Sequence, residues 1–277
     1  MGADSESGVN RGSLVAVGGA ESRSREPLIL GRFVYESGGR SADLLVVPAA
    51  SSRDDAGADY RRVFLRLGAR SANVLPLGDR SEAMSEVSVE AVRKASGIFF
   101  TGGDQMTLAE RISGTAVADA IRSANASGVT VGGTSAGAAF LSRQMIAYGK
   151  SGSAPRRDMV TLAPGLGLTS LFVIDQHFRQ RDRLGRLLTA LAAQPGMIGL
   201  GLDEDTAAFI GPDTLEVVGD GTITLVDTAD ATTPRVNRPD RHDAICLLGL
   251  RLHILTHGSA FDVSSRTARP PNRGWRE

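Results

Sequence analysis

The chain has 277 residues, of which 42% are hydrophobic and 22% are charged, and its formal net charge at pH 7 is zero. This composition is ordinary for a globular protein that is long enough to bury a sizeable core. Zero net charge provides no overall field that would attract nucleic acid or an anionic membrane, so we expect neither as a partner. The single cysteine, Cys246, excludes an internal disulfide framework and indicates a reducing compartment.

The N-terminal residues carry no visible targeting signal. Met1 to Gly12 are polar and rich in glycine and serine, without the apolar stretch of a secretory signal, and we expect residues 1–12 to be disordered. No apolar run approaches the roughly 20 residues that a membrane-spanning helix needs. We therefore expect a soluble, cytoplasmic protein.

Short apolar runs alternate with longer amphipathic stretches over the first two thirds of the chain. We predict strands at residues 14–18, 43–47, 72–75, 97–100, 129–131 and 171–174. Helices are predicted between them at residues 26–37, 55–67, 81–95, 105–112, 115–126 and 185–193. The alternation predicts an α/β fold with a doubly wound, mostly parallel sheet and helices on both faces. Loops after these strands should gather at one edge, where ligands bind in such folds.

The pattern changes after Gly196. Strands are predicted at residues 197–202, 206–210, 214–218, 222–226 and 252–255. Their succession favours an antiparallel extension of the same domain, residues 13–263, although a separate subdomain stays open. We predict an exposed loop at residues 227–243 and a disordered tail at residues 264–277.

A G-x-S-x-G motif, Gly133–Gly137, follows the strand predicted at residues 129–131. In this motif a serine lies on a sharp strand-to-helix turn with its hydroxyl above the sheet, and flanking glycines allow the close approach. Ser135 is the candidate nucleophile, followed by a helix from Ala138 to about Arg143. The alternative is a glycine-rich loop that only turns the chain.

A serine nucleophile needs a base, and His177 is the best placed of the four histidines. It follows the strand predicted at residues 171–174, so it should lie at the same sheet edge as Ser135. His253 and His257 have a spacing that occurs in zinc sites, but on an extended segment they would not share one helical face. We expect no metal and no cofactor.

The orienting acid should come from Gly201–Thr206, which contains three carboxylates directly after a predicted strand. Glu204 is preferred, while Asp203 and Asp205 are almost as suitable by spacing, and a hydrated acidic turn is the alternative. A carboxylate beside the imidazole would stabilise the imidazolium that forms during catalysis.

Two backbone N–H groups are needed to bind an oxyanion. We expect the first from Ala136 and the second from Gly102 or Gly103, at the end of the strand predicted at residues 97–100. Four arginines follow His177 and would be suited to bind substrate carboxylates, although a charged, solvent-facing helix start is also consistent with them; they are Arg179, Arg181, Arg183 and Arg186.

Several segments together are more specific than any one motif. They are residues 100–105 (FTGGDQ), 132–138 (GGTSAGA), 175–178 (DQHF) with Arg181, Arg183, Leu184, Gly185 and Arg186, residues 201–206 (GLDEDT) and, as weaker support, residues 248–253 (LGLRLH). With these segments the chain, from about Ser13 to Asp262, resembles the cyanophycinase family, which is similar to the aspartyl dipeptidase called peptidase E. The loop at residues 227–243 and the tail do not match the family.

The resemblance implies a fold of the flavodoxin-like or class I glutamine amidotransferase-like kind. It implies Ser135 as nucleophile, His177 as base and Glu204 as acid. It also implies that six further residues shape the substrate pocket: Gln105, Asp175, Gln176, Arg181, Arg183 and Arg186. Members of the family hydrolyse cyanophycin, a polyaspartate that carries arginine on its side-chain carboxyls, to β-Asp-Arg dipeptides. They are usually homodimers.

Three other functions stay open at this point. An aspartyl or isoaspartyl dipeptidase would share the fold and the chemistry. An α/β-hydrolase esterase would place its histidine after its acid and could use His253 or His257. The third is a non-catalytic module that holds a ligand derived from an amino acid.

Overall fold

The computed structural model describes residues 11–23, 27–51, 55–232 and 243–271. The largest element is a nine-stranded sheet in the order β15-β14-β11-β10-β1-β5-β4-β2-β3. From β1 to β3 neighbouring strands are parallel, and from β1 to β15 they are antiparallel. The parallel strands are β1 (Leu14–Val17), β2 (Asp43–Val47), β3 (Ser71–Val74), β4 (Gly97–Phe100) and β5 (Thr130–Thr134). The α/β class is therefore confirmed, with a mixed sheet.

The alternating side chains of the parallel strands form two separate cores, one on each face. On one face Val15 and Val17 pack with α1 (Leu28–Glu36) and α2 (Ala56–Arg66). On the other face Leu14 and Ala16 belong to a core that includes residues of four further helices. These are α3 (Glu86–Arg93), α4 (Gln105–Ile112), α5 (Ala116–Ala126) and α6 (Ala136–Phe140). Burial on both faces explains why the central strands β1, β2 and β4 are apolar runs.

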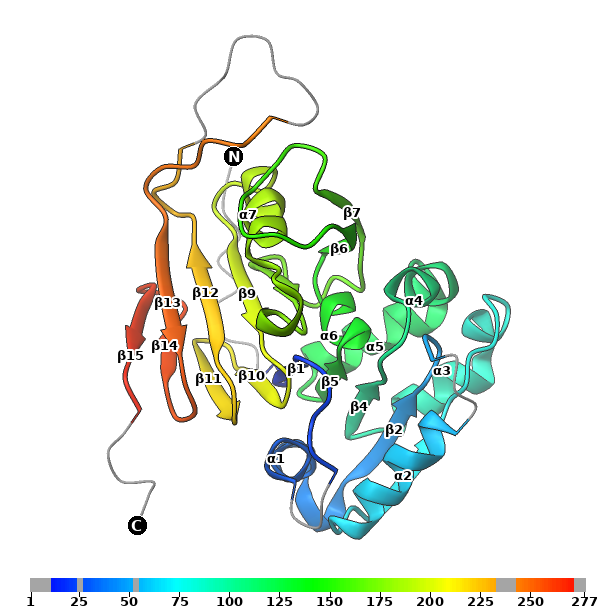
Figure 1. Cartoon of the computed structure of the whole chain (residues 1–277). Helices are drawn as coiled ribbons and strands as arrows, with labels where there is room; N and C mark the ends of the chain where they lie inside the picture. Colours follow the sequence, from blue (N-terminus) through cyan, green and yellow to red (C-terminus); the bar gives the residue numbers. More distant parts are fainter. Residues whose placement is uncertain (1–10, 24–26, 52–54, 233–242, 272–277) are drawn as a thin grey trace.

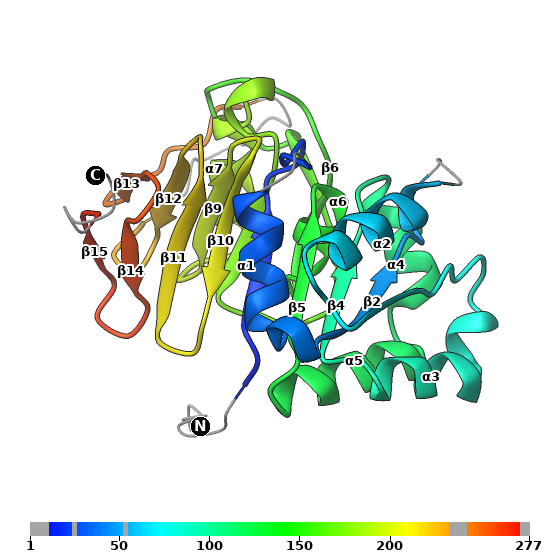
Figure 2. The same cartoon turned by 90° about the horizontal axis from the view of Figure 1, so that it is seen from below.

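The strands after residue 196 are divided between two sheets, a division that the sequence did not reveal. The strands β10 (Thr206–Ile210), β11 (Thr214–Gly219), β14 (Ala260–Asp262) and β15 (Thr267–Arg269) join the large sheet. A second sheet has the order β13-β12-β9-β8 and consists of β8 (Phe172–Asp175), β9 (Ile198–Leu202), β12 (Ile223–Asp227) and β13 (Arg251–Leu255). Figures 1 and 2 show the C-terminal strands at one end of the molecule and β2 at the other.

The strand before His177, β8, lies in the second sheet and not in the parallel sheet where we expected it. It pairs in parallel with β9, and α7 (Leu184–Ala192) connects the two strands. Helix α7 packs closely on this pair, because a Cβ at Gly199 would lie 2.7 Å from a methyl carbon of Leu191. A parallel pair needs a crossover helix, and α7 provides it.

Two predicted helices are shorter in the structure. Within residues 81–95 the chain forms a 3-10 turn (Glu82–Met84) before α3, because the Ser85 hydroxyl accepts the Ser88 N–H and so begins a new helix. Helix α6 ends at Phe140, not Arg143, and the Phe140 carbonyl accepts the Leu166 N–H at 2.7 Å. The chain between Phe140 and Leu166 forms an antiparallel hairpin of β6 (Gln144–Gly149) and β7 (Val160–Pro164), which the sequence did not predict.

The prediction of a disordered tail is wrong for the residues that the structure describes. Strand β15 pairs with β14, and the carboxylate of Asp262, the last residue of β14, accepts hydrogen bonds from Ser264 and Ser265. At the other end, Gly12 donates its N–H to Asn125 at 2.8 Å, so order begins before β1. In the predicted loop Asp227 and Thr228 are buried, while residues 1–10, 233–242 and 272–277 lie outside the described residues.

The single-domain boundaries, residues 13–263, stay a prediction. Across the described ranges no helix is long and apolar enough to cross a membrane.

Candidate active site

Ser135 lies in a sharp turn between β5 and α6. Its backbone has φ of 53° and ψ of −114°, a conformation that costs a residue with a side chain about 1–3 kcal/mol. Gly133 and Gly137 make the turn sterically feasible, since a Cβ at Gly133 would lie 2.5 Å from the Gly137 carbonyl carbon. The turn therefore requires glycine where the G-x-S-x-G motif has it.

His177 is brought to Ser135 from the second sheet. It follows β8, its N–H donates to the Gly18 carbonyl at 2.8 Å, and its Nε2 lies 3.0 Å from the Ser135 hydroxyl oxygen. The C-terminal ends of β8 and β5 thus lie close together beside Gly18, which follows β1, although β8 and β5 belong to different sheets. This is hydrogen-bond distance for a base that takes the serine proton.

Of the three carboxylates on Gly201–Thr206, Glu204 is the one at the imidazole. Its Oε1 lies 2.6 Å from His177 Nδ1. Asp203 is 1% exposed and accepts two hydrogen bonds from Thr222, and Asp205 accepts the Ser22 N–H at 2.7 Å. The geometry therefore separates three residues that spacing alone left open.

The pKa of His177 is lowered from its ordinary value of 6.5, chiefly because burial disfavours the charged imidazolium. The hydrogen bond with Glu204 raises this pKa, whereas the positive charges of Arg181 and Arg183 lower it further. The net direction keeps the imidazole neutral at pH 7, as a general base requires.

The backbone around Ser135 offers N–H groups for an oxyanion. Ala136 is the first residue of α6, so its N–H has no acceptor within the helix. Gly102 lies beside the serine, since a Cβ there would be 3.4 Å from Ser135 Cβ. Gly103 has a φ of 145°, and a Cβ there would lie 1.8 Å from the Ala50 carbonyl oxygen. The assignment of the Ala136 and Gly103 N–H groups to the oxyanion stays a prediction. Of the two candidate glycines, Gly102 is the one that lies beside Ser135.

Four of the predicted pocket residues form a buried cluster behind the histidine. Arg186 binds the Asp175 carboxylate through two nitrogens, with Nε 2.6 Å from Oδ2. Arg183 Nη1 lies 2.9 Å from Gln176 Oε1 and 3.3 Å from Asp175 Oδ1, and burial lowers the Arg183 pKa to about 10. All four side chains are less than one tenth exposed. They bind one another, and their direct contact with substrate stays a prediction.

The other two predicted pocket residues are placed differently. Arg181 is exposed, donates its N–H to the His177 carbonyl at 3.1 Å, and has a charge close enough to shift the His177 pKa. Gln105 Nε2 donates to the Ala147 carbonyl at 2.7 Å and so joins α4 to β6. Arg181 is thus the arginine whose charge faces solvent beside the base.

The loop Gly18–Ser22 has a role that the sequence did not reveal. Gly18 accepts the His177 N–H, and the Gly19 carbonyl accepts the Asp205 N–H at 2.9 Å. The signal available was the glycine pair at the end of β1, which indicated only a loop at the ligand-binding edge. In the structure this loop joins the histidine segment to the acid segment.

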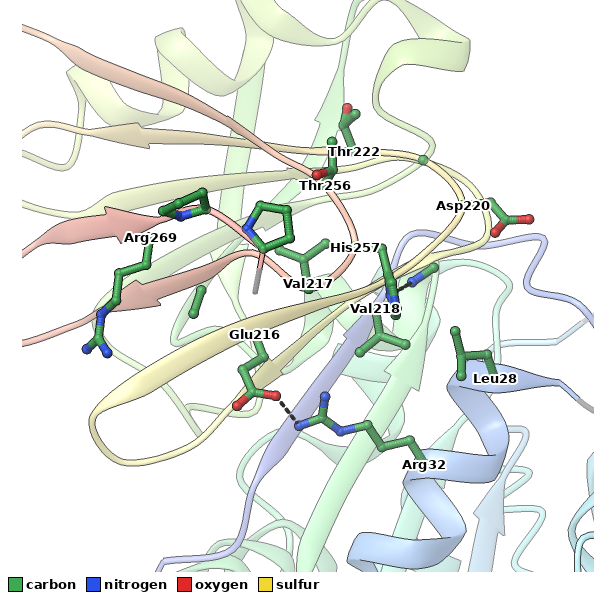
Figure 3. A pocket seen from close by; sticks show the side chains of 16 residues that line it. Leu28, Arg32, Glu216, Val217, Val218, Asp220, Thr222, Thr256, His257 and Arg269 are labelled. Atoms are coloured by element: carbon green, nitrogen blue, oxygen red, sulfur yellow. Dashed lines mark hydrogen bonds and ion pairs between the residues drawn. The ribbon is translucent and has the colours of Figure 1, made fainter. Parts of the chain in front are cut away.

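His253 and His257, the alternative bases, lie elsewhere. The His253 ring packs 6.1 Å from the Phe261 ring, and His257 Nδ1 accepts the Gly219 N–H. His257 lines a cavity of about 1490 Å³ between α1, β11 and the C-terminal strands, together with Glu216 and Arg32 (Figure 3). The cavity lining includes none of Ser135, His177 and Glu204.

Comparison with known proteins shows which family the chain resembles. Residues 14–218 match the model of peptidase family S51. Cyanophycinases of Geminocystis herdmanii and Synechococcus elongatus are similar, with 40% identity over 255 residues (91% of this chain, 94% of the relative) and 39% over 257 (92% and 80%).

Two solved structures are also similar. A peptidase from an acI-B1 Actinobacterium has a TM-score of 0.67 and 25% identity, covering 91% of this chain and 97% of that one. A putative peptidase E from Listeria monocytogenes shares the fold, with a TM-score of 0.51 and 16% identity over 76% of this chain and all of the other. With most of its length matched, the chain belongs to peptidase family S51.

Proposed function

We propose that the chain is a serine exopeptidase that hydrolyses cyanophycin to β-Asp-Arg dipeptides with a triad of Ser135, His177 and Glu204. The observation that carries the proposal is the continuous series of contacts, 3.0 Å from Ser135 to His177 and 2.6 Å from His177 to Glu204. The identity of about two fifths to cyanophycinases supports this choice of substrate among aspartyl peptides.

In the proposed mechanism His177 Nε2 takes the hydroxyl proton of Ser135 as its oxygen attacks the scissile carbonyl. The Ala136 N–H and a glycine N–H of residues 102–103 bind the oxyanion. His177 then protonates the leaving amine, and water hydrolyses the acyl-enzyme with His177 again as base. Glu204 keeps the proton on Nδ1 and stabilises the imidazolium, which is the task of a carboxylate at that nitrogen.

The substrate presents both carboxylates and guanidinium groups, and Arg181 is suited to the former. Its side chain is exposed, lies near the base and has no ion pair with any residue that the structure describes, so it can bind a substrate carboxylate bidentately. Asp175 is less suited to a substrate guanidinium, because Arg186 and Arg183 already occupy it.

The test is incubation of the purified chain with insoluble cyanophycin and, separately, with β-aspartyl and α-aspartyl dipeptides. We expect β-Asp-Arg from the polymer, and none of it from Ser135→Ala. Cleavage of free dipeptides alone would move the assignment to the dipeptidase alternative. A folded protein whose Ser135 does not react with a serine-directed phosphonate would support the ligand-binding module instead.

Three finer expectations belong to the same proposal. The family resemblance supports a doubly wound, flavodoxin-like arrangement, a homodimer and a cytoplasmic location. Light scattering coupled to size exclusion tests the dimer, and it does so independently of the catalytic assay.

A further inference from the structure

A buried carboxylate lies directly behind the reactive turn. Glu21 is 5% exposed and belongs to the loop between β1 and α1. Its Oε2 accepts a hydrogen bond from the Thr134 hydroxyl at 2.6 Å, and its Oε1 accepts one from the Tyr60 hydroxyl. Burying a carboxylate is costly unless it is paired, and these two hydroxyl donors supply part of that pairing. One of these donors, Thr134, immediately precedes Ser135.

The far side of Glu21 is fixed by α2. Tyr60 is 2% exposed, and its pKa is raised well above the ordinary value, mainly by burial, so its hydroxyl stays protonated and donates. Arg23 donates to the same hydroxyl at 2.9 Å, and its guanidinium lies 4.3 Å from the centre of the ring. The Arg23 guanidinium also lies 3.9 Å from Glu21 Oε1, so this side of the carboxylate keeps a partner even without the Tyr60 hydroxyl.

The near side of Glu21 holds the turn. Thr134 is the last residue of β5 and is itself buried, and its hydroxyl donates to Glu21. The strained backbone of Ser135 persists only if its neighbours are held firmly. A charge-assisted hydrogen bond at the preceding residue does this at the strand side of the turn.

The loop that contains Glu21 also contacts the other two catalytic segments. Gly18 accepts the His177 N–H, and Ser22 donates its N–H to Asp205, the neighbour of Glu204. Glu21 of the same loop contacts the third segment, because it accepts the hydroxyl hydrogen bond of Thr134, the residue before Ser135. One loop thus touches all three chain segments that the proposed triad requires.

We propose that Glu21 is a positioning residue: acting through Thr134, it holds the Ser135 hydroxyl at hydrogen-bond distance from His177 Nε2 without touching substrate. The inference rests on the proposed function, because it assigns Glu21 a role in that same triad.

The experiment compares Thr134→Val, which removes the hydroxyl at nearly constant shape, with Thr134→Ser, which keeps it. Tyr60→Phe is the matched control, since it also removes one donor from Glu21 but leaves the Thr134 contact. Each variant is checked by thermal unfolding. Activity is measured as kcat and KM on soluble short cyanophycin, and reactivity as the rate of phosphonate labelling of Ser135.

We expect Thr134→Val to lower kcat and the labelling rate by roughly 10- to 100-fold, the scale of an ångström misplacement, with KM nearly unchanged. Thr134→Ser should recover most of both rates, and Tyr60→Phe should keep them while unfolding at lower temperature. If Thr134→Val does not fold, Glu21→Met replaces it, because Met keeps the length of the side chain but removes both oxygen acceptors, and we expect the same loss.

Wild-type kcat in folded Thr134→Val, or an equal loss in Tyr60→Phe, would overturn the role of Glu21. Ser135→Ala is measured in the same assay. If it is inactive while Thr134→Val is fully active, the positioning role alone fails. If Ser135→Ala stays active, the proposed triad fails and the positioning role fails with it.

Discussion

Gly19 lies against the imidazole of His177 with no room for a side chain between them. A Cβ at Gly19 would lie 2.3 Å from Cε1 and 2.5 Å from Nε2 of the ring. The ring cannot move aside freely, because one of its nitrogens contacts Ser135 and the other contacts Glu204. The glycine after β1 is thus part of the site through its lack of a side chain.

Gly19→Ala should therefore lower kcat by about 100-fold or more, because the methyl displaces the imidazole by an ångström or so. Gly38→Ala is the control: Gly38 has a similar φ of 114°, but its nearest neighbour would be 3.6 Å from the new methyl and it lies outside the site. Both variants should lose some stability from the left-handed backbone, measured by thermal unfolding. Equal activity in the two variants would show that the Gly19 contact does not matter.

Glu204→Gln should lower kcat by about 10²- to 10⁴-fold, since an amide no longer stabilises the imidazolium and favours the wrong tautomer. Asp205→Asn is the matched variant on the same segment. Its amide oxygen can still accept the Ser22 N–H, so its kcat should stay near that of the wild type. Steady-state kinetics on soluble cyanophycin measure both, and a larger loss in Asp205→Asn would reassign the acid.

Local elements were predictable where a strong pattern lay within one segment. The predicted ranges 43–47, 97–100 and 206–210 coincide with β2, β4 and β10, and the range 105–112 coincides with α4. These strands are buried on both faces, so continuous apolar runs define them.

Sheet membership was not predictable from the same patterns. An apolar run such as Phe172–Asp175 suits either sheet, and its place depends on the packing of α7 over β9, which lies more than twenty residues away. The β6–β7 hairpin was missed because Gln144 follows α6 closely without a glycine or proline to separate them.

In the candidate site, too, residues marked by a local pattern were predictable, and residues placed by distant contacts were not. Ser135 and His177 could be singled out because a motif or a strand end marks each of them. Asp203, Glu204 and Asp205 could not be separated by spacing, since one residue of register decides which side chain faces the imidazole. Glu21 has no motif of its own, and its contact with Thr134 joins residues 113 positions apart.

The pH dependence of kcat/KM should show an acidic limb below pH 6.5, because the pKa of His177 is lowered and only the neutral imidazole acts as base. Arg181→Gln should move this limb to higher pH, since removing a nearby positive charge makes the imidazolium less unfavourable and raises the pKa. Arg179→Gln is the control, because the Arg179 side chain is exposed and its Nε lies 3.5 Å from Asp203. A limb that moves equally in both variants would contradict a specific effect of Arg181.

Truncation of Arg186 should lower the stability of the protein, whereas truncation of Arg181 should weaken substrate binding. The reason is that Arg186 is buried in an ion pair and Arg181 is exposed. Arg186→Ala leaves the buried Asp175 carboxylate short of a partner and should lower the free energy of unfolding by about 3–5 kcal/mol. Arg181→Ala should change it by no more than about 0.5 kcal/mol, yet raise KM roughly tenfold through the lost substrate carboxylate contact. Urea unfolding and KM measured on both variants decide the matter. Unchanged stability with a raised KM in Arg186→Ala would make Arg186 a direct substrate contact, as the family resemblance implied.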